Sequence, residues 1–95
     1  MQFPRPRRTV PAAEREKIVI AHCSTARRIA TEICRERGLS HTDRERATGA
    51  ALQALVAAVA ESAQPNSPGF AVHAEARMKL AVLTLVERLE QSRAA

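Results

Sequence analysis

The chain has 95 residues, of which 45% are hydrophobic but only Phe3 and Phe70 are aromatic, and it contains no Trp or Tyr. A chain this short forms one small domain with a modest core, and the scarcity of aromatic side chains argues against base stacking on single-stranded nucleic acid. The formal net charge is +5, and residues 1–46 carry all of it, with eleven Lys or Arg against six Asp or Glu. This asymmetry suits a phosphate backbone, an acidic protein or another anionic surface.

The apolar segments are short. No apolar stretch follows the N-terminal sequence MQFPRPRR, and the longest unbroken apolar run, residues 54–60, is far shorter than the roughly 20 residues of a membrane span. We therefore expect a cytoplasmic protein that does not enter the membrane.

Two cysteines, Cys23 and Cys34, are eleven residues apart. On one continuous helix they would lie about 16 Å apart, too far for a disulfide bond or a shared metal ion. We expect two buried thiols, no metal and no cofactor.

Residues 1–13 are predicted to form a flexible basic arm. Pro4, Pro6 and Pro11 disfavour helix and central strand, and arginines alternate with the first two prolines. An extended basic arm can follow a phosphate backbone. The residues expected to contact nucleic acid are Arg5, Arg7 and Arg8 on this arm and Lys17, Arg27, Arg28 and Arg35 on the helix that follows.

A first helix is predicted over residues 14–37, with Gly38 in the position that follows a helix C-terminus. Its buried stripe comprises Val19, His22, Cys23, Ala26, Ile29, Ala30 and Ile33. His22 is interpreted as a hydrogen-bonded histidine at the edge of the core, because neither His41 nor His73 stands at metal-ligand spacing from it.

Residues 17–23 also admit a strand that leads into a helix at Ser24. His22, Cys23 and the following arginines would then resemble the phosphate loop of cysteine phosphatases. That loop requires an arginine six positions after the cysteine, where this chain has Ile29. The helical interpretation is therefore favoured, since a motif needs its structural context.

A second helix is predicted over residues 43–63, with Thr42 and Glu45 as a capping box. Its large apolar face would comprise Leu52, Leu55, Val56, Val59 and Ala63. A second face carries small residues, Ala47, Ala50, Ala51, Ala54, Ala57 and Ala58, and would let another helix approach closely.

A third helix is predicted over residues 68–91, with Ser67 as its N-cap and Pro68 as its first residue. Its main apolar stripe comprises Ala71, Ala74, Met78, Ala81, Val82, Leu85, Val86 and Leu89, and Phe70 is expected to close one end of the core. A second apolar set crosses the helix: Val72, Ala76, Leu80 and Leu83. We expect this set to form a protein interface, because one small bundle buries only one stripe, and a homodimer is the simplest partner.

The sequence thus predicts an all-α protein, a small antiparallel three-helix bundle over residues 14–95 with a basic, proline-containing N-terminal arm. No catalytic residue set is recognisable, so a non-enzymatic role is expected. The preferred function is a nucleic-acid-binding accessory or regulatory protein that contacts DNA or RNA through its basic half. The alternative is a protein-binding adaptor or inhibitor, of the kind found among small mobile-element or phage-type proteins, that acts through its helix surfaces.

Overall fold

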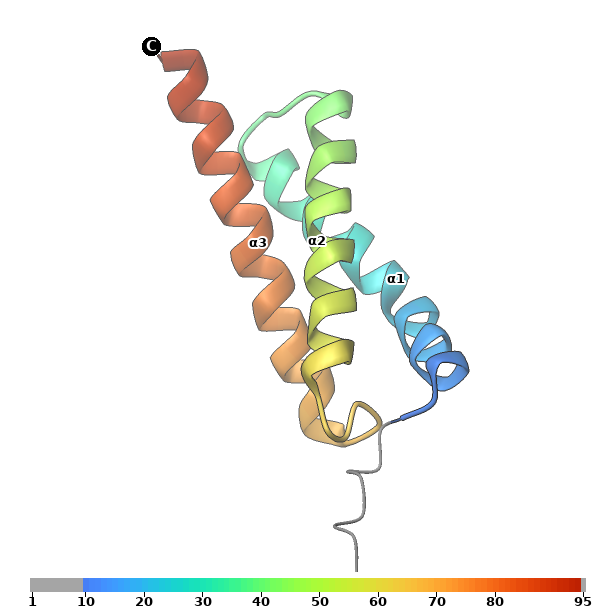
Figure 1. The fold of residues 1–95 in the computed structure, drawn as a ribbon. Coiled ribbons are helices and arrows are strands. Elements are labelled where there is room, and N and C mark those ends of the chain that lie inside the picture. The colour runs from blue at the N-terminus through green and yellow to red at the C-terminus, as the bar shows by residue number, and fades with distance from the viewer. Residues whose placement is uncertain (1–9, 95) are drawn as a thin grey trace, which may run out of the picture.

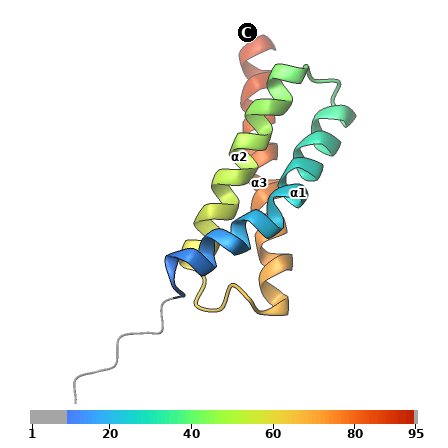
Figure 2. The ribbon, with the colours of Figure 1, turned by 90° about the vertical axis from the view of Figure 1, so that its right-hand side faces the viewer.

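The computed structural model describes residues 10–94, which form three helices: α1 (Ala12–Glu36), α2 (His41–Glu61) and α3 (Pro68–Ala94). The predicted all-helical fold of three packed helices is confirmed, and residues 10–94 contain no strand. The chain reverses direction at each of the two loops, and α1 is tilted relative to α2 in both views (Figures 1 and 2). Over the same residues, no helix has the length and hydropathy that a membrane crossing requires.

The N-terminus of α1 differs from the prediction. The helix begins at Ala12, so it includes the last two residues of the expected arm. Pro11 precedes the helix, and its carbonyl oxygen accepts a hydrogen bond from the Arg15 amide at 3.1 Å. Residues 1–9 lie outside the described part of the chain, and with them the three arm arginines.

The C-terminus of α1 is closed as the sequence predicts. Gly38 has a φ of 65°, in the left-handed region that glycine adopts without steric cost. The Leu39 amide donates to the Cys34 carbonyl at 2.9 Å, and the Gly38 amide donates to the Arg35 carbonyl at 3.2 Å. These two bonds make a Schellman motif, which satisfies carbonyl groups that the helix leaves without a partner.

The cap of α2 is shifted from the predicted position. Ser40 is the N-cap, and its hydroxyl accepts a hydrogen bond from the Asp43 amide at 3.2 Å. The expected capping box of Thr42 and Glu45 is wrong, because the helix already begins at His41. Only Leu39 and the N-cap residue Ser40 therefore separate Gly38, which closes the C-terminus of α1, from the first residue of α2.

The core is formed by side chains from all three helices. The buried residues are Ile18, Ala26, Ile29, Ala30 and Cys34 on α1; Ala47, Ala51, Leu55, Ala58 and Val59 on α2; and Phe70, Ala74, Met78, Val82 and Val86 on α3. Six further hydrophobic side chains pack against them while partly exposed: Val19, Ile33, Leu39, Leu52, Ala54 and Leu85. The predicted apolar stripe lies on the correct face of α1. Ile18 and Cys34, which were not part of that stripe, are buried, whereas four of its members are only half-buried: Val19, His22, Cys23 and Ile33.

The main difference from the predicted core is the face of α2 that is buried. Val56 is 52% exposed and Ala63 is exposed, whereas Ala47, Ala51 and Ala58 from the predicted small-residue face are fully buried. Small side chains allow neighbouring helices to pack closely, so the alanines face the core. On α3 the predicted stripe is largely correct, although Ala71 is exposed.

Candidate functional site

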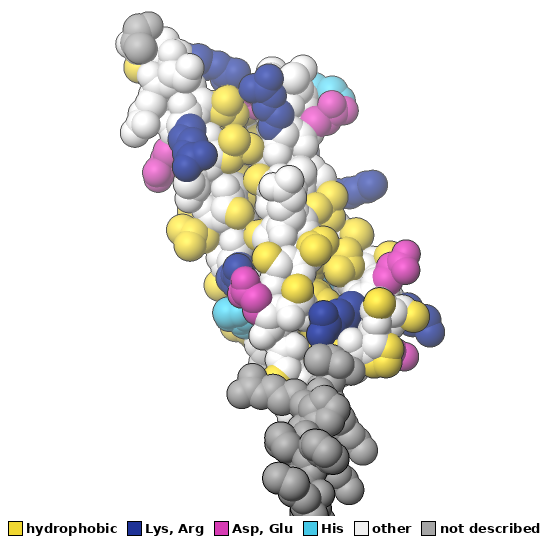
Figure 3. All heavy atoms as spheres, viewed as in Figure 1, with side chains coloured by type: hydrophobic (Ala, Val, Ile, Leu, Met, Phe, Trp, Pro, Cys, Tyr) yellow, Lys and Arg dark blue, Asp and Glu magenta, His cyan; other side chains and the backbone are white. Residues whose placement is uncertain are grey.

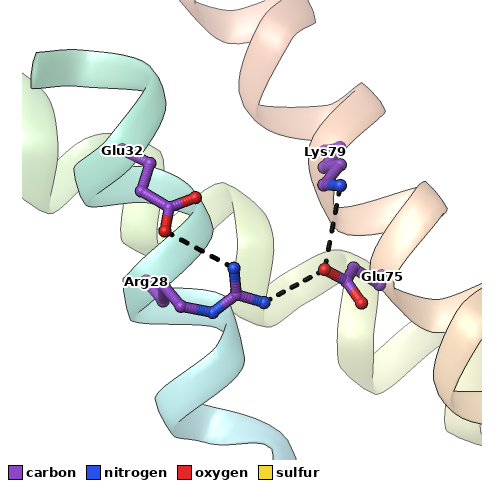
Figure 4. A network of polar contacts seen from close by, with 4 residues as sticks. All are labelled: Arg28, Glu32, Glu75 and Lys79. Carbon is purple, nitrogen blue, oxygen red and sulfur yellow. Dashed lines mark hydrogen bonds and ion pairs between the residues drawn. The ribbon is translucent and has the colours of Figure 1, made fainter. Parts of the chain in front are cut away.

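Arg28 is part of an ion-pair network that joins α1 to α3 (Figure 4). Its Nη2 atom donates to Glu75 Oε1 at 3.0 Å, and its Nη1 atom lies 3.5 Å from Glu32 Oε1. Lys79 Nζ lies 3.7 Å from the same Glu75 oxygen. The hydrogen bond between the two side chains raises the pKa of Arg28 and lowers that of Glu75. Within the bundle, Arg28 is therefore already paired with two carboxylates, those of Glu32 and Glu75.

Three other predicted basic residues, Lys17, Arg27 and Arg35, lie exposed along α1. None of them forms an ion pair within residues 10–94. Their exposure agrees with the sequence analysis, and their contact with an external anion stays a prediction.

Arg27 lines a surface hollow of about 380 Å³ between α1 and α2, which we call the α1–α2 hollow. Its lining residues are Arg27 and Thr31 from α1 and His41, Arg44, Glu45 and Thr48 from α2. Arg44 thus joins Arg27 at one site, although the two residues are far apart in the sequence. The Arg44 Nε atom is buried and has no hydrogen-bond partner in the described part of the chain.

The lining of the hollow includes two arginines and two threonines. Guanidinium groups are the preferred protein ligands of phosphate. The Thr48 hydroxyl donates to the Arg44 carbonyl at 2.8 Å, and His41 Nε2 lies 3.2 Å from Glu45 Oε1. Glu45 is the acidic residue of the lining, so the positive charge of the hollow exceeds its negative charge by one with histidine neutral.

Arg44 was not among the residues predicted to contact nucleic acid. Its position close to the start of α2, three residues after His41, was a usable signal, because short loops between helices place that end beside α1. The pairing with Arg27 depends on how the two helices pack, and the sequence pattern did not show it.

Several of the remaining arginines form ion pairs with carboxylates of another helix. Arg37 Nη1 lies 2.6 Å from Glu90 Oε1, Arg93 pairs with Asp43, and Arg77 pairs with Glu61. With the Arg28–Glu75 pair, each ion pair between different helices in residues 10–94 includes a residue of α3.

The described residues hold twelve Lys or Arg and ten Asp or Glu, so the bundle itself is only weakly basic. On the face shown in Figure 3, Lys and Arg side chains are spread along the surface and a band of hydrophobic side chains lies between α2 and α1. Any strong attraction to a polyanion therefore requires the three arm arginines in addition to the bundle.

The predicted protein-interface residues lie on the outer side of α3. Val72 is 73% exposed and Leu80 is 66% exposed, which is far more than is usual for large aliphatic side chains. Ala76 is exposed and Leu83 is partly buried. Leu80 also lines a second hollow of about 510 Å³ between α2 and α3, which includes Ala54 and Ala81.

His22, Cys23 and Cys34 each contact or lie among neighbouring side chains of the bundle. The half-buried His22 ring lies edge-to-face with Phe70, with ring centroids 5.8 Å apart. Cys34 is fully buried, whereas Cys23 is half-buried and its Sγ atom donates to the Val19 carbonyl, so the expectation of two buried thiols is wrong for Cys23. Within residues 10–94, no group of three His, Cys, Asp or Glu side chains is arranged to hold a metal ion.

No protein-family model, no curated protein and no solved structure matches this chain.

Proposed function

We propose that this chain is a cytoplasmic, non-enzymatic nucleic-acid-binding accessory or regulatory protein. The observation that supports this proposal is the convergence of Arg27 and Arg44 on the α1–α2 hollow, beside the side chains of Thr31 and Thr48. A hollow with two guanidinium groups suits a phosphate group of a nucleic-acid backbone.

The contacts in this proposal are made to phosphates. Lys17 and Arg35 extend the basic positions along α1, and the arginines of the N-terminal arm add further charge. Phosphate contacts position a protein on a duplex without reading its sequence, so we propose limited sequence specificity. Because the bundle is weakly charged, the arm and the hollow act together, and binding weakens steeply as salt is added.

The test is duplex binding measured over a salt series with a double variant, Arg27→Ala with Arg44→Ala. Each lost phosphate contact lowers the slope of log affinity against log salt by about 0.9, so this variant loses roughly 1.8 units. The matched control is Arg46→Ala with Arg88→Ala, which removes two arginines that line no part of the α1–α2 hollow. The control is expected to keep most of the wild-type slope.

The arm is tested separately by replacing Arg5, Arg7 and Arg8 with Ala, which is expected to reduce the slope by up to roughly three units. Equal slopes for the hollow variant and its control would assign the binding to charge in general and exclude the hollow. No binding to duplex or single strands at about 50 mM salt and tens of micromolar protein would contradict the proposed function, since electrostatic binding is strongest at low salt.

The exposed aliphatic side chains of α3 support a second candidate, a protein-binding adaptor or inhibitor. Val72 and Leu80 are exposed in a way that a monomeric bundle does not require. If nucleic-acid binding is absent, this candidate takes precedence, and a target protein that binds the wild type but not the Leu80→Glu variant would support it.

A further inference from the structure

The outer side of α3 carries a seam of residues at alternating spacings of three and four. We call it the α3 seam, and it comprises His73, Ala76, Leu80, Leu83 and Glu87. This alternation is the repeat of a coiled coil, in which the seam of one helix packs against the seam of another. The opposite side of α3, with Met78, Val82 and Val86, is already buried in the core at 0–1% exposure. The α3 seam is therefore a second packing surface on a helix whose first surface is occupied.

The centre of the α3 seam is apolar and contains two leucines. Leu80 is 66% exposed, and Val72 beside the seam is 73% exposed. Ala76 is small and allows a second helix to approach closely. The α2–α3 hollow next to Leu80, lined in part by Ala54 and Ala81, leaves space for an incoming aliphatic side chain.

The α3 seam carries its negative charge at one end only. Glu87 lies toward the C-terminus of α3, whereas the opposite end carries His73, which holds no carboxylate. An antiparallel copy of the seam brings the His73 end of one chain to the Glu87 end of the other, and the helix dipoles also oppose each other favourably. A parallel copy would place Glu87 beside Glu87 and repel.

We propose that the α3 seam binds the α3 seam of a second copy of this chain, antiparallel and related by a two-fold axis. One patch then serves both partners, as a two-fold interface requires. The α1–α2 hollow is lined only by residues of α1 and α2, so this dimer leaves it accessible in both copies. This association of two chains does not depend on nucleic-acid binding.

The interface is small. The α3 seam spans fifteen residues, or about 21 Å of helix. Contacts through one helix of this length fall at the low end of interface sizes, so we expect a dissociation constant of about 10–100 µM.

The first experiment is sedimentation of the full chain at concentrations from about 10 µM to about 1 mM, without nucleic acid. The wild type is expected to reach the mass of a dimer. Leu80→Glu is expected to raise the dissociation constant at least about 100-fold, because the two-fold axis places the change in the interface twice. The matched control is Ile20→Glu, which adds the same charge at an aliphatic residue on α1 that is 64% exposed. The control is expected to dimerise like the wild type, and circular dichroism checks the fold of both variants.

The second experiment tests orientation and keeps Leu80 intact, so it stands even if the Leu80→Glu variant fails to fold. In a Cys23→Ser background that keeps His73 and Glu87, chains with Ala76→Cys are mixed with chains with Leu83→Cys and oxidised. Cross-links between the two kinds of chain are expected to dominate. Dominant cross-linking of either kind of chain to itself would overturn the antiparallel arrangement. The interface would be overturned if the wild type stayed monomeric at about 1 mM, or if a folded Leu80→Glu variant still dimerised. The α3 seam would then be a candidate contact surface for a different protein.

Discussion

Asp43 near the start of α2 forms an ion pair with Arg93 near the end of α3. Arg93 Nη2 lies 2.7 Å from Asp43 Oδ2 and 2.9 Å from Oδ1. The Asp43 side chain is only 3% exposed, whereas that of Arg93 is 55% exposed. The hydrogen bond from Arg93 is the main reason that the pKa of Asp43 lies below its ordinary value, although burial acts in the opposite direction.

Asp43 is therefore predicted to make stability depend on acid pH. A carboxylate whose pKa is lowered by folding contributes stability above its unfolded pKa, about 3.9, and loses that contribution as the pH falls through the lower folded value. Asp43→Asn removes the charge, so the variant is less stable than the wild type at pH 7 and the difference shrinks below about pH 4. Urea denaturation at several pH values measures both stabilities. A difference that stays constant down to pH 2 would contradict this assignment.

Two glycines are predicted to respond to alanine in opposite directions. Gly38 has a φ of 65°, so Gly38→Ala places a side chain in the left-handed region and is expected to destabilise the protein by about 1–2 kcal/mol. Gly49 lies inside α2, where Gly49→Ala is expected to stabilise by about 0.5–1 kcal/mol.

At both glycines an added Cβ atom meets no atom within 4 Å, so the difference isolates backbone conformation from packing. Thermal unfolding of the two variants tests it directly. A destabilised Gly49→Ala variant would show that α2 is not regular at that position.

Adjacent residues on α2 are predicted to differ sharply in their contribution to stability. Leu55 is fully buried and Val56 is 52% exposed. Leu55→Ala is expected to cost about 2–5 kcal/mol, because it removes buried methyl groups and leaves a cavity. Val56→Ala is expected to change stability by less than about 0.5 kcal/mol, as most surface substitutions do. Chemical denaturation gives both values, and similar losses for the two variants would place Val56 in a buried contact.

The two thiols are predicted to react at different rates. Cys34 is fully buried, and burial is the main reason that its pKa is raised, so its thiol stays protonated and unreactive in the folded protein. Cys23 is only half-buried. Alkylation followed by mass spectrometry is expected to modify Cys23 first and Cys34 only after unfolding. Equal modification of both residues in the folded state would show that α1 opens at its C-terminal end.

Features set by neighbouring residues were predictable from the sequence. The glycine that follows α1 at Gly38 and the start of α3 at Pro68 depend on a few adjacent residues, and both positions were correctly predicted. The capping of α2 was misplaced by two residues, because Ser40 and Thr42 are chemically similar caps.

Features that depend on packing between helices were harder to predict from the sequence. On α2 the pattern of large side chains indicated that Val56 is buried, whereas close packing instead buries Ala47 and Ala51. Glu75 lies 47 residues after Arg28, and no local pattern shows that it engages this arginine. The same long-range packing brings Arg44 to Arg27, which is why the α1–α2 hollow was not anticipated as a site.

The dependence of the bundle on α3 has a consequence for protein synthesis. Helices α1 and α2 leave the ribosome first, and their shared apolar faces stay open to solvent until Met78, Val82 and Val86 have been translated. The carboxylate of Asp43 also lacks its ion-pair partner until Arg93 has been translated. A ribosome that stalls or terminates before α3 thus releases a helical hairpin with an uncovered core, which is a substrate for chaperones and proteases. Correct assembly of these three helices is therefore decided only when α3 emerges from the ribosome.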